Sequence, residues 1–183
     1  MEGHRQTIKI KDKIFETFIK ESDIQEVIKD VAEKINADLA GKNPLFLVIL
    51  NGAFMFAADL MKSITIDSQV SFVKLSSYSG TQTTQVVREL IGLDSSIEGR
   101  CVVIVEDIID TGMTMEHLLN NLKGLGAKEV RIATLTFKPD AFRYDYPIDY
   151  IGMRIPNDFI VGYGFDYDGY GRNSADIYKI IEN

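Results

Sequence analysis

The most informative stretch of the chain is CVVIVEDIIDTGMTM, residues 101–115. A buried strand is predicted to end in two adjacent carboxylates, Glu106 and Asp107, and a third, Asp110, precedes a Thr-Gly-Met-Thr turn that opens a helix. In open α/β sheets, ligands bind outside the carboxyl ends of the strands. A Thr/Gly turn at a helix N-terminus offers free N–H groups, hydroxyls and the positive end of the helix dipole, which suit a phosphate.

The carboxylates suit a different part of the same ligand. They accept hydrogen bonds from a vicinal diol, or bind Mg²⁺, which keeps several waters and takes only a few protein oxygens. A ligand with both a diol and a phosphate is a ribose phosphate. The alternative is that these acids are helix caps or solvated loop charges. The chain has neither GxxxxGK[ST] nor a GxGxxG after a strand, so a P-loop and a dinucleotide-binding turn are unsupported.

The elements that must position this site alternate between strands and helices. Continuous apolar runs at 45–50 and 101–105 predict strands buried on both faces, which is typical of a parallel sheet. Further strands are predicted over 70–75 and 130–137, with a hairpin arm over 86–93. Helices are predicted over 24–39, 53–62 and 114–125. The helix over 24–39 is expected to have Ser22 as its N-cap and to end at Gly41. The pattern indicates an α/β fold with a mainly parallel, twisted sheet flanked by helices.

The two ends of the chain are expected to form a small hood over one end of the sheet. From Tyr150 onward the sequence is irregular and rich in Gly, Asp and Tyr, and Thr7–Ile10 is a candidate strand. We therefore expect a single domain over residues 1–183, with a core of about 20–150 and a hood from about 1–15 and 151–183.

Composition excludes several classes of protein and site. The net charge of −7 makes the chain a poor candidate for binding nucleic acid or an anionic membrane. Cys101 is the one cysteine, and His4 and His117 are the two histidines, which excludes an internal disulfide, a CxxC metal site and a cage of several histidines. The charged start has no signal-peptide core, and the apolar stretch from Leu45 to Ala58 is too short for a membrane span. A cytoplasmic protein is expected.

The segment VVIVEDIIDTGMTM resembles the signature for phosphoribosyl pyrophosphate in the purine phosphoribosyltransferases. Further blocks follow the order of the hypoxanthine (hypoxanthine–guanine) branch over nearly the whole chain: LNGAF (50–54), SSYSG (76–80), FKPD (137–140) and IPNDFIVGYGFDYDGYGRN (155–173). The resemblance implies a type I phosphoribosyltransferase fold and a Mg²⁺-dependent enzyme of purine salvage. Such an enzyme transfers the 5-phosphoribosyl group from phosphoribosyl pyrophosphate to N9 of hypoxanthine, or of guanine, giving IMP or GMP and pyrophosphate.

The resemblance assigns roles in the ribose-phosphate half of the site. Glu106 and Asp107 would hold the ribose hydroxyls, directly or through Mg²⁺, and Asp110 would be the base that handles the proton on purine N7. The residues expected to cradle the 5'-phosphate are Thr111, Gly112, Met113 and Thr114, with Met115 as a further candidate.

It assigns the purine half as well. Lys138 would donate to the exocyclic O6 of a 6-oxopurine, Phe159 would stack on the ring, and the Ile160 backbone would bind its edge. Asp166 would ligate a second Mg²⁺.

Pyrophosphate and the lid complete the expected site. Arg172 and the Asn51–Gly52 turn would contact pyrophosphate, and the peptide bond entering the second residue of that turn can be cis in the family. The loop at 76–84, with Ser77 and Tyr78, is expected to act as a lid, because an oxocarbenium-like ribose must be protected from water.

The chain departs from the family pattern at three positions. Asn51 stands where many relatives carry Lys, so only the backbone of that turn is expected to contact pyrophosphate. Met113 stands where a basic residue is common, so phosphate affinity would rest on N–H groups and hydroxyls. Phe165 is expected near the C2 substituent of the purine, where its ring would disfavour guanine or xanthine.

Two alternatives remain open from sequence. One is a related transferase that prefers xanthine or guanine. The other is a non-catalytic sensor of phosphoribosyl pyrophosphate, which would need none of Asp110, Lys138 and Asp166. Relatives form dimers and tetramers, so a homodimer or homotetramer is expected.

Overall fold

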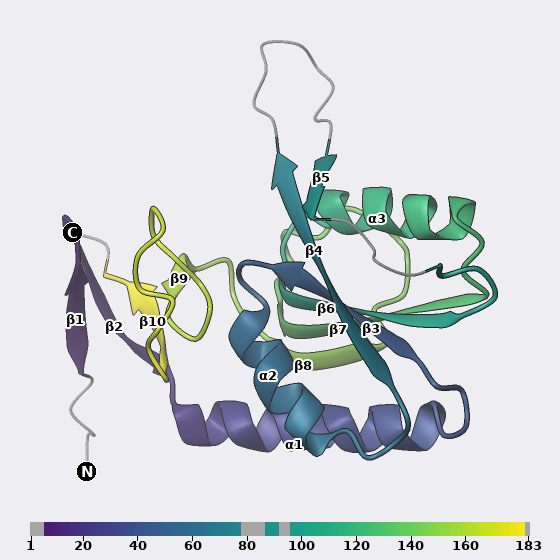
Figure 1. The fold of residues 1–183 in the computed structure, drawn as a ribbon. Helices are drawn as coiled ribbons and strands as arrows, with labels where there is room; N and C mark the ends of the chain where they lie inside the picture. Colours follow the sequence, from purple (N-terminus) through teal and green to yellow (C-terminus); the bar gives the residue numbers. More distant parts are fainter. Residues whose placement is uncertain (1–5, 78–86, 92–95, 182–183) are drawn as a thin grey trace.

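The computed structural model describes residues 6–77, 87–91 and 96–181. These residues form a larger sheet with the strand order β5-β4-β3-β6-β7-β8 and a smaller sheet with the order β1-β2-β10-β9. The smaller sheet stands to one side of the larger one, on the left of Figure 1.

The larger sheet is mainly parallel, as predicted. Its strands are β3 (Leu45–Leu50), β4 (Gln69–Ser77), β5 (Val87–Ile91), β6 (Cys101–Ile109), β7 (Glu129–Phe137) and β8 (Tyr150–Arg154). Neighbouring strands from β4 to β8 run parallel, and β5 returns antiparallel to β4 as the expected hairpin arm.

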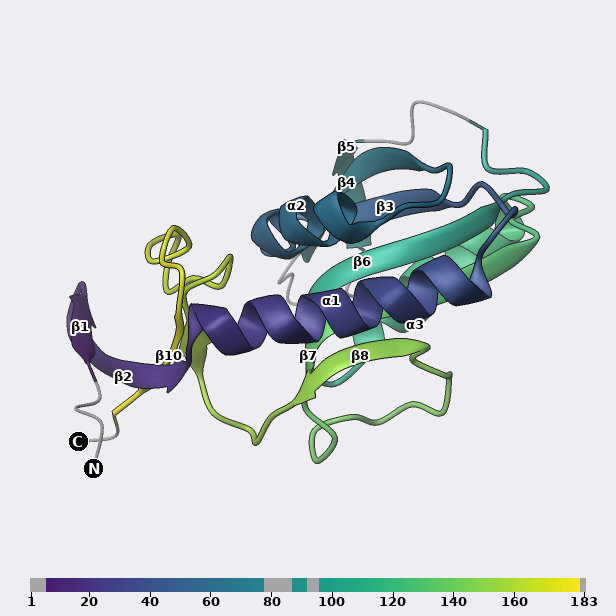
Figure 2. The same ribbon diagram turned by 90° about the horizontal axis from the view of Figure 1, so that it is seen from below.

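Helices cover both faces of this sheet (Figure 2). On one face, α1 (Glu21–Asp38) packs against β8 and against α2 (Phe54–Ser63), and α3 (Met113–Gly124) covers the other face. Strand β3 alternates between the two cores: Phe46 and Val48 pack beneath α1 and α2, and Leu47 packs on the side of α3. The continuous apolar run of β3 thus reflects burial on both faces.

The predicted N-cap of α1 is wrong. The helix begins at Glu21, and the Ser22 hydroxyl donates to the Asp23 carboxylate at 3.2 Å instead of accepting a backbone N–H. The Glu21 N–H donates instead to Oδ1 of Asp176, at 2.8 Å. A residue 155 positions away thus satisfies a free N–H of the first turn, which no local pattern could indicate.

The hood exists, with boundaries that differ from the expected ones. It is the antiparallel sheet of β1 (Thr7–Ile10), β2 (Lys13–Ile19), β9 (Ile160–Val161) and β10 (Ile177–Ile180). The N-terminal part therefore runs to the end of β2. Residues 151–154, assigned to the hood from sequence, belong to β8, because β8 pairs with β7 and lies under α1.

A partly buried carboxylate, that of Asp59, ties the loop between β9 and β10 (residues 162–176, the hood loop) to the two helices of one face. Asp59 on α2 accepts hydrogen bonds from the Tyr163 hydroxyl (2.5 Å), Gln25 on α1 (2.7 Å) and Lys62 (2.8 Å). Burial raises the pKa of the Asp59 carboxyl, but these three donors lower it by more, so the net pKa lies below its ordinary value. Since Tyr163 itself is buried, this contact fixes where the following loop starts.

Asp59→Asn is expected to lower the free energy of unfolding by about 1–2 kcal/mol at neutral pH, because the three donors lose a charged acceptor. The folded pKa lies below the ordinary value of about 3.9, so this stabilisation is present above about pH 4 and is lost as pH falls through the folded pKa. Urea unfolding of wild type and variant should therefore converge at acid pH. Asp67→Asn, at an exposed aspartate, is the control and should change little. A pH-independent difference for Asp59→Asn would contradict this origin of the stability.

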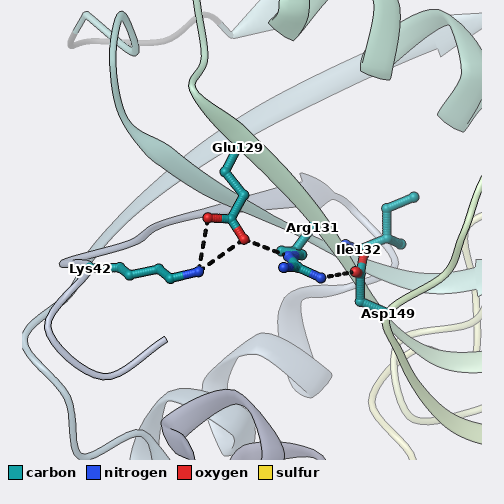
Figure 3. Close-up of polar contacts among 5 residues, drawn as sticks. All are labelled: Lys42, Glu129, Arg131, Ile132 and Asp149. Carbon is teal, nitrogen blue, oxygen red and sulfur yellow. Dashed lines mark hydrogen bonds and ion pairs between the residues drawn. The ribbon is translucent and has the colours of Figure 1, made fainter. Parts of the chain in front are cut away.

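A charged network fixes the opposite end of the sheet (Figure 3). Glu129 at the start of β7 accepts from Lys42 (2.9 Å) and Arg131 (2.7 Å). Arg131 also donates to Asp149 (2.7 Å), which accepts the N–H of Ile132 at 2.9 Å. The network joins the turn before β3 to the segment before β8, away from the carboxyl ends where a ligand would bind.

Among the described residues, no helix has the length and apolar character to cross a membrane.

Candidate active site

A cavity of about 410 Å³ opens at the carboxyl ends of β3 and β6. Eleven residues singled out from the sequence line it: Gly52, Glu106, Asp107, Asp110, Thr111, Gly112, Met113, Thr114, Met115, Asp166 and Arg172. Apolar walls come from the ends of β3 and β6, from β4 and from Met115. The structure thus brings together the acid pair (Glu106 and Asp107), the turn at residues 111–114 expected to bind phosphate, and two residues of the hood loop.

Glu106 and Asp107 lie on β6 itself, since that strand continues to Ile109 rather than ending before them. Glu106 is 8% exposed, and burial together with the charge of Asp107 raises its pKa well above the ordinary value. Burial raises the pKa of Asp107 as well. Within the described residues neither carboxylate forms an ion pair, so the pair favours a hydrogen-bond donor or a cation from the ligand side.

Gly52 allows the Asp107 carboxylate to approach the turn after β3. A β-carbon built on Gly52 would overlap the Asp107 carboxylate, so only glycine fits. The cis peptide bond is the one between Leu50 and Asn51, one residue earlier than expected. Gly164 of the hood loop packs against the same turn, because a β-carbon there would overlap the Gly52 carbonyl oxygen.

The turn before α3 presents a helix N-terminus to the cavity. Gly112 is the N-cap with a φ of +91°, and Met113 is the first helical residue, one earlier than predicted. The first helical hydrogen bond is from the Glu116 N–H to the Gly112 carbonyl at 3.1 Å. The N–H groups of the first turn therefore have no partner within the helix and are available to an anion.

Arg172 and Asp166 face each other across the hood side of the cavity. Their ion pair measures 2.6 Å, and Arg172 also donates to the Gly164 carbonyl at 2.6 Å. The second oxygen of Asp166 accepts the Gly169 N–H at 2.6 Å. The guanidinium is thus held in place, with its charge next to the acid pair, where it lowers the pKa of Asp107 in part.

Lys138 contacts Asp110, which lines the cavity. Its side chain is 9% exposed, and its ammonium lies 3.5 Å from the Asp110 carboxylate, which is 47% exposed. The Lys138 N–H donates to the carbonyl of Ile109 at 3.0 Å, which fixes the end of β7 against the end of β6. A cation and a carboxylate therefore stand side by side at the rim.

Other predicted site residues do not line this cavity. Phe159 is 46% exposed on the hood, 6.0 Å from the Tyr167 ring, and Ile160 lies in β9. Phe165 packs into the core beneath α1 and α2, and its expected place beside the purine C2 substituent stays a prediction. The Asn51 side chain is exposed.

The expected lid falls mostly outside the described residues. Ser77 is the last residue of β4, and Tyr78 lies beyond the part that the structure describes.

Several supporting residues were not predicted from sequence. Thr136 on β7 donates to the Asp107 carbonyl at 3.0 Å, and Tyr146 donates to the Gly112 carbonyl at 2.8 Å. Residues 142–150 are rich in aromatic side chains, but nothing in that pattern indicates Gly112 as a contact.

Magnesium would have to be held by few protein oxygens. The described residues contain no group of three or more His, Cys, Asp or Glu side chains that could hold a metal ion, and Asp166 is engaged by Arg172. The buried pair of Glu106 and Asp107 is compatible with Mg²⁺, which proteins commonly hold with one or two carboxylates together with waters and substrate phosphates.

Comparison with known families identifies the class to which this fold and site belong. The model of the phosphoribosyl transferase domain matches residues 19–168. The parallel sheet flanked by helices, with its site at the strand ends, is the type I phosphoribosyltransferase fold.

The individual relatives place the chain within that class. The hypoxanthine-guanine phosphoribosyltransferase of Streptococcus agalactiae serotype V is 41% identical over 90% of this chain and 92% of its own length, and that of Mycobacterium bovis is 42% identical over 79% and 75%. A hypoxanthine phosphoribosyltransferase structure from Staphylococcus aureus is 36% identical, covers 90% of both chains and has a TM-score of 0.85. The chain belongs to the hypoxanthine-guanine phosphoribosyltransferases, transferases of purine salvage.

Proposed function

We propose that the protein catalyses Mg²⁺-dependent transfer of the 5-phosphoribosyl group from phosphoribosyl pyrophosphate to N9 of hypoxanthine, and of guanine, releasing IMP or GMP and pyrophosphate. The observation that carries this proposal is the single cavity in which a carboxylate pair, a helix N-terminus and an arginine meet. These groups match a ribose diol, a 5'-phosphate and a pyrophosphate.

The ribose-phosphate half follows from hydrogen-bonding chemistry. Glu106 and Asp107 would accept hydrogen bonds from the two ribose hydroxyls, or would hold the ribose through a bound Mg²⁺ ion. The 5'-phosphate binds the backbone N–H groups and hydroxyls of residues 111–114 at the positive end of α3. Because Met113 brings no charge, the turn and the helix dipole supply this binding.

The pyrophosphate half depends on Arg172 and the backbone of the Asn51–Gly52 turn. Breaking the bond at C1' builds negative charge on pyrophosphate, which the guanidinium neutralises. Mg²⁺, when bound near Glu106 and Asp107, supplies the same charge stabilisation and orients the leaving group. Asp166, which we expected to hold a second Mg²⁺, would first have to leave its ion pair with Arg172.

Asp110 and Lys138 handle the purine. Asp110 accepts the proton from N7 as N9 attacks C1', and Lys138 donates to O6 of the 6-oxopurine. The Lys138 ammonium and the Asp110 carboxylate lie 3.5 Å apart, so one purine edge can present O6 to Lys138 and N7 to Asp110. We expect Phe159 to stack on the purine ring and the Ile160 backbone to bind its edge.

The experiment is to incubate the protein with phosphoribosyl pyrophosphate and hypoxanthine, with Mg²⁺ or with excess chelator, and to quantify nucleotide and pyrophosphate. IMP and pyrophosphate in equal amounts, with loss of turnover in chelator and recovery on adding Mg²⁺, are expected. Full turnover in chelator would contradict the metal role. Binding of phosphoribosyl pyrophosphate without product would favour the sensor instead.

Gly52→Ala is expected to lower kcat/KM for phosphoribosyl pyrophosphate about tenfold or more, because the new methyl group displaces Asp107. Steady-state kinetics on the purified variant measure this. Gly124→Ala is the matched control, since a β-carbon at that helical position meets nothing within 4 Å. Wild-type kinetics for Gly52→Ala would refute the close approach.

We also propose that the enzyme assembles as a homodimer or homotetramer. A neighbouring structure, 31% identical with a TM-score of 0.86, concerns the role of the C-terminal region in the oligomeric state of a Trypanosoma cruzi hypoxanthine phosphoribosyl transferase. Light scattering at working concentration tests this, and a monomer would refute it.

A further inference from the structure

We propose that Tyr146 is a positioning residue that holds the phosphate-binding turn at Thr111–Gly112 from its protein side. The inference rests on the proposed function, since it concerns how that turn receives the 5'-phosphate. It assigns a specific task to the segment 142–146, which lies outside the cavity lining.

Both carbonyl groups of the turn are hydrogen-bonded by this segment. The Tyr146 hydroxyl donates to the Gly112 carbonyl at 2.8 Å, and the Arg143 N–H donates to the Thr111 carbonyl at 3.1 Å. The Gly112 carbonyl also accepts the first helical bond, from the N–H of Glu116. The orientation of these peptide groups sets the direction of the N–H groups that follow, so the two contacts preset the phosphate site.

Aromatic packing adds a steric constraint at Gly112. A β-carbon on Gly112 would lie 2.6 Å from the Phe142 ring and 2.7 Å from the Tyr146 hydroxyl oxygen. The rings of Phe142 and Tyr146 meet edge to face with centroids 5.1 Å apart, and Phe142 meets Phe137 in the same way at 5.3 Å. This cluster is anchored on β7, so the turn rests against the sheet rather than on a free loop.

Residues 139–141 connect this segment to Lys138, the proposed purine-binding lysine. The Lys138 N–H bonds the end of β6, and the Arg143 guanidinium donates to the carbonyls of Asp140 (2.8 Å) and Phe142 (3.1 Å). Residues 138–146 are therefore fixed at both ends against the β6–α3 connection. Burial raises the pKa of Tyr146, so its hydroxyl keeps the proton that it donates.

The test is Tyr146→Phe, which keeps the ring and removes the hydrogen bond. We expect KM for phosphoribosyl pyrophosphate to rise about fivefold, the ratio that corresponds to one hydrogen bond of about 1 kcal/mol. KM for hypoxanthine and kcat should stay within about twofold of wild type, since the ring packing remains. Tyr144→Phe is the matched control, because its ring joins the same cluster and its hydroxyl makes no hydrogen bond within the described residues.

A second readout separates positioning from a general structural role. Titration calorimetry should show weaker binding of IMP to Tyr146→Phe, with binding of inosine, which lacks the 5'-phosphate, unchanged. Equal losses of affinity for IMP and inosine, an equal rise in both KM values, or no change in either affinity or either KM would overturn the inference.

If wild type makes no IMP at all, the proposed function fails. If wild type is active and Tyr146→Phe behaves like wild type, only this inference fails.

Discussion

Asp110→Asn should lower kcat by about 10²- to 10⁴-fold, the contribution usual for a positioned general base. Asparagine keeps the shape of the side chain but has no basic oxygen to take the N7 proton. Since Asp110 is partly exposed at the cavity rim, the substitution should fold normally. Steady-state kinetics with hypoxanthine and phosphoribosyl pyrophosphate give the measurement, with both KM values expected within a few-fold of wild type.

The control for this loss is Asp145→Asn, at an exposed aspartate on the segment behind the turn. It should leave kcat unchanged. Near-wild-type turnover by Asp110→Asn would rule out the base assignment. A loss confined to KM would instead give Asp110 a binding role.

Lys138→Gln is expected to relax selectivity for 6-oxopurines, lowering the ratio of kcat/KM for hypoxanthine to that for adenine by about 10²-fold or more. The ammonium only donates hydrogen bonds, and adenine presents an NH₂ group at the same place, so adenine offers the buried Lys138 no acceptor. Lys138 is 7% exposed, which makes that mismatch costly. Glutamine offers both a donor and an acceptor.

The ratio is the quantity to measure, because Lys138→Gln also removes the partner of Asp110 and should lower both rates. Lys128→Gln, at an exposed lysine, is the control and should leave the ratio unchanged. An unaltered ratio in Lys138→Gln would refute recognition of O6 by this residue.

Much of the fold could be predicted because local pattern and burial agree. The run Leu45–Leu50 is apolar at every position because β3 is buried on both faces, and that is also what makes its parallel pairing predictable. The strand over Tyr150–Arg154 was missed because it is short, and only Tyr150 in it is fully buried. The N-cap at Ser22 failed because a distant residue, Asp176, takes that role.

Only the part of the site that lies within one short segment of the chain could be predicted from the sequence. The acid pair and the turn at 110–114 lie within one segment, so their joint presence at the cavity follows from the strand–turn–helix connection. The approach of Asp107 to Gly52 and of Gly164 to the same turn joins residues far apart in the chain. No spacing rule predicts such contacts, because they depend on how the hood loop settles on the sheet.

The most direct measurement is turnover of the purified wild type with phosphoribosyl pyrophosphate and Mg²⁺, offering hypoxanthine, guanine, xanthine and adenine separately and following nucleotide by chromatography. The account predicts nucleotide from hypoxanthine and guanine and none from adenine. Nucleotide from adenine at a comparable rate would contradict the role of Lys138. No nucleotide from any base would contradict the central claim that this cavity transfers a phosphoribosyl group to a 6-oxopurine.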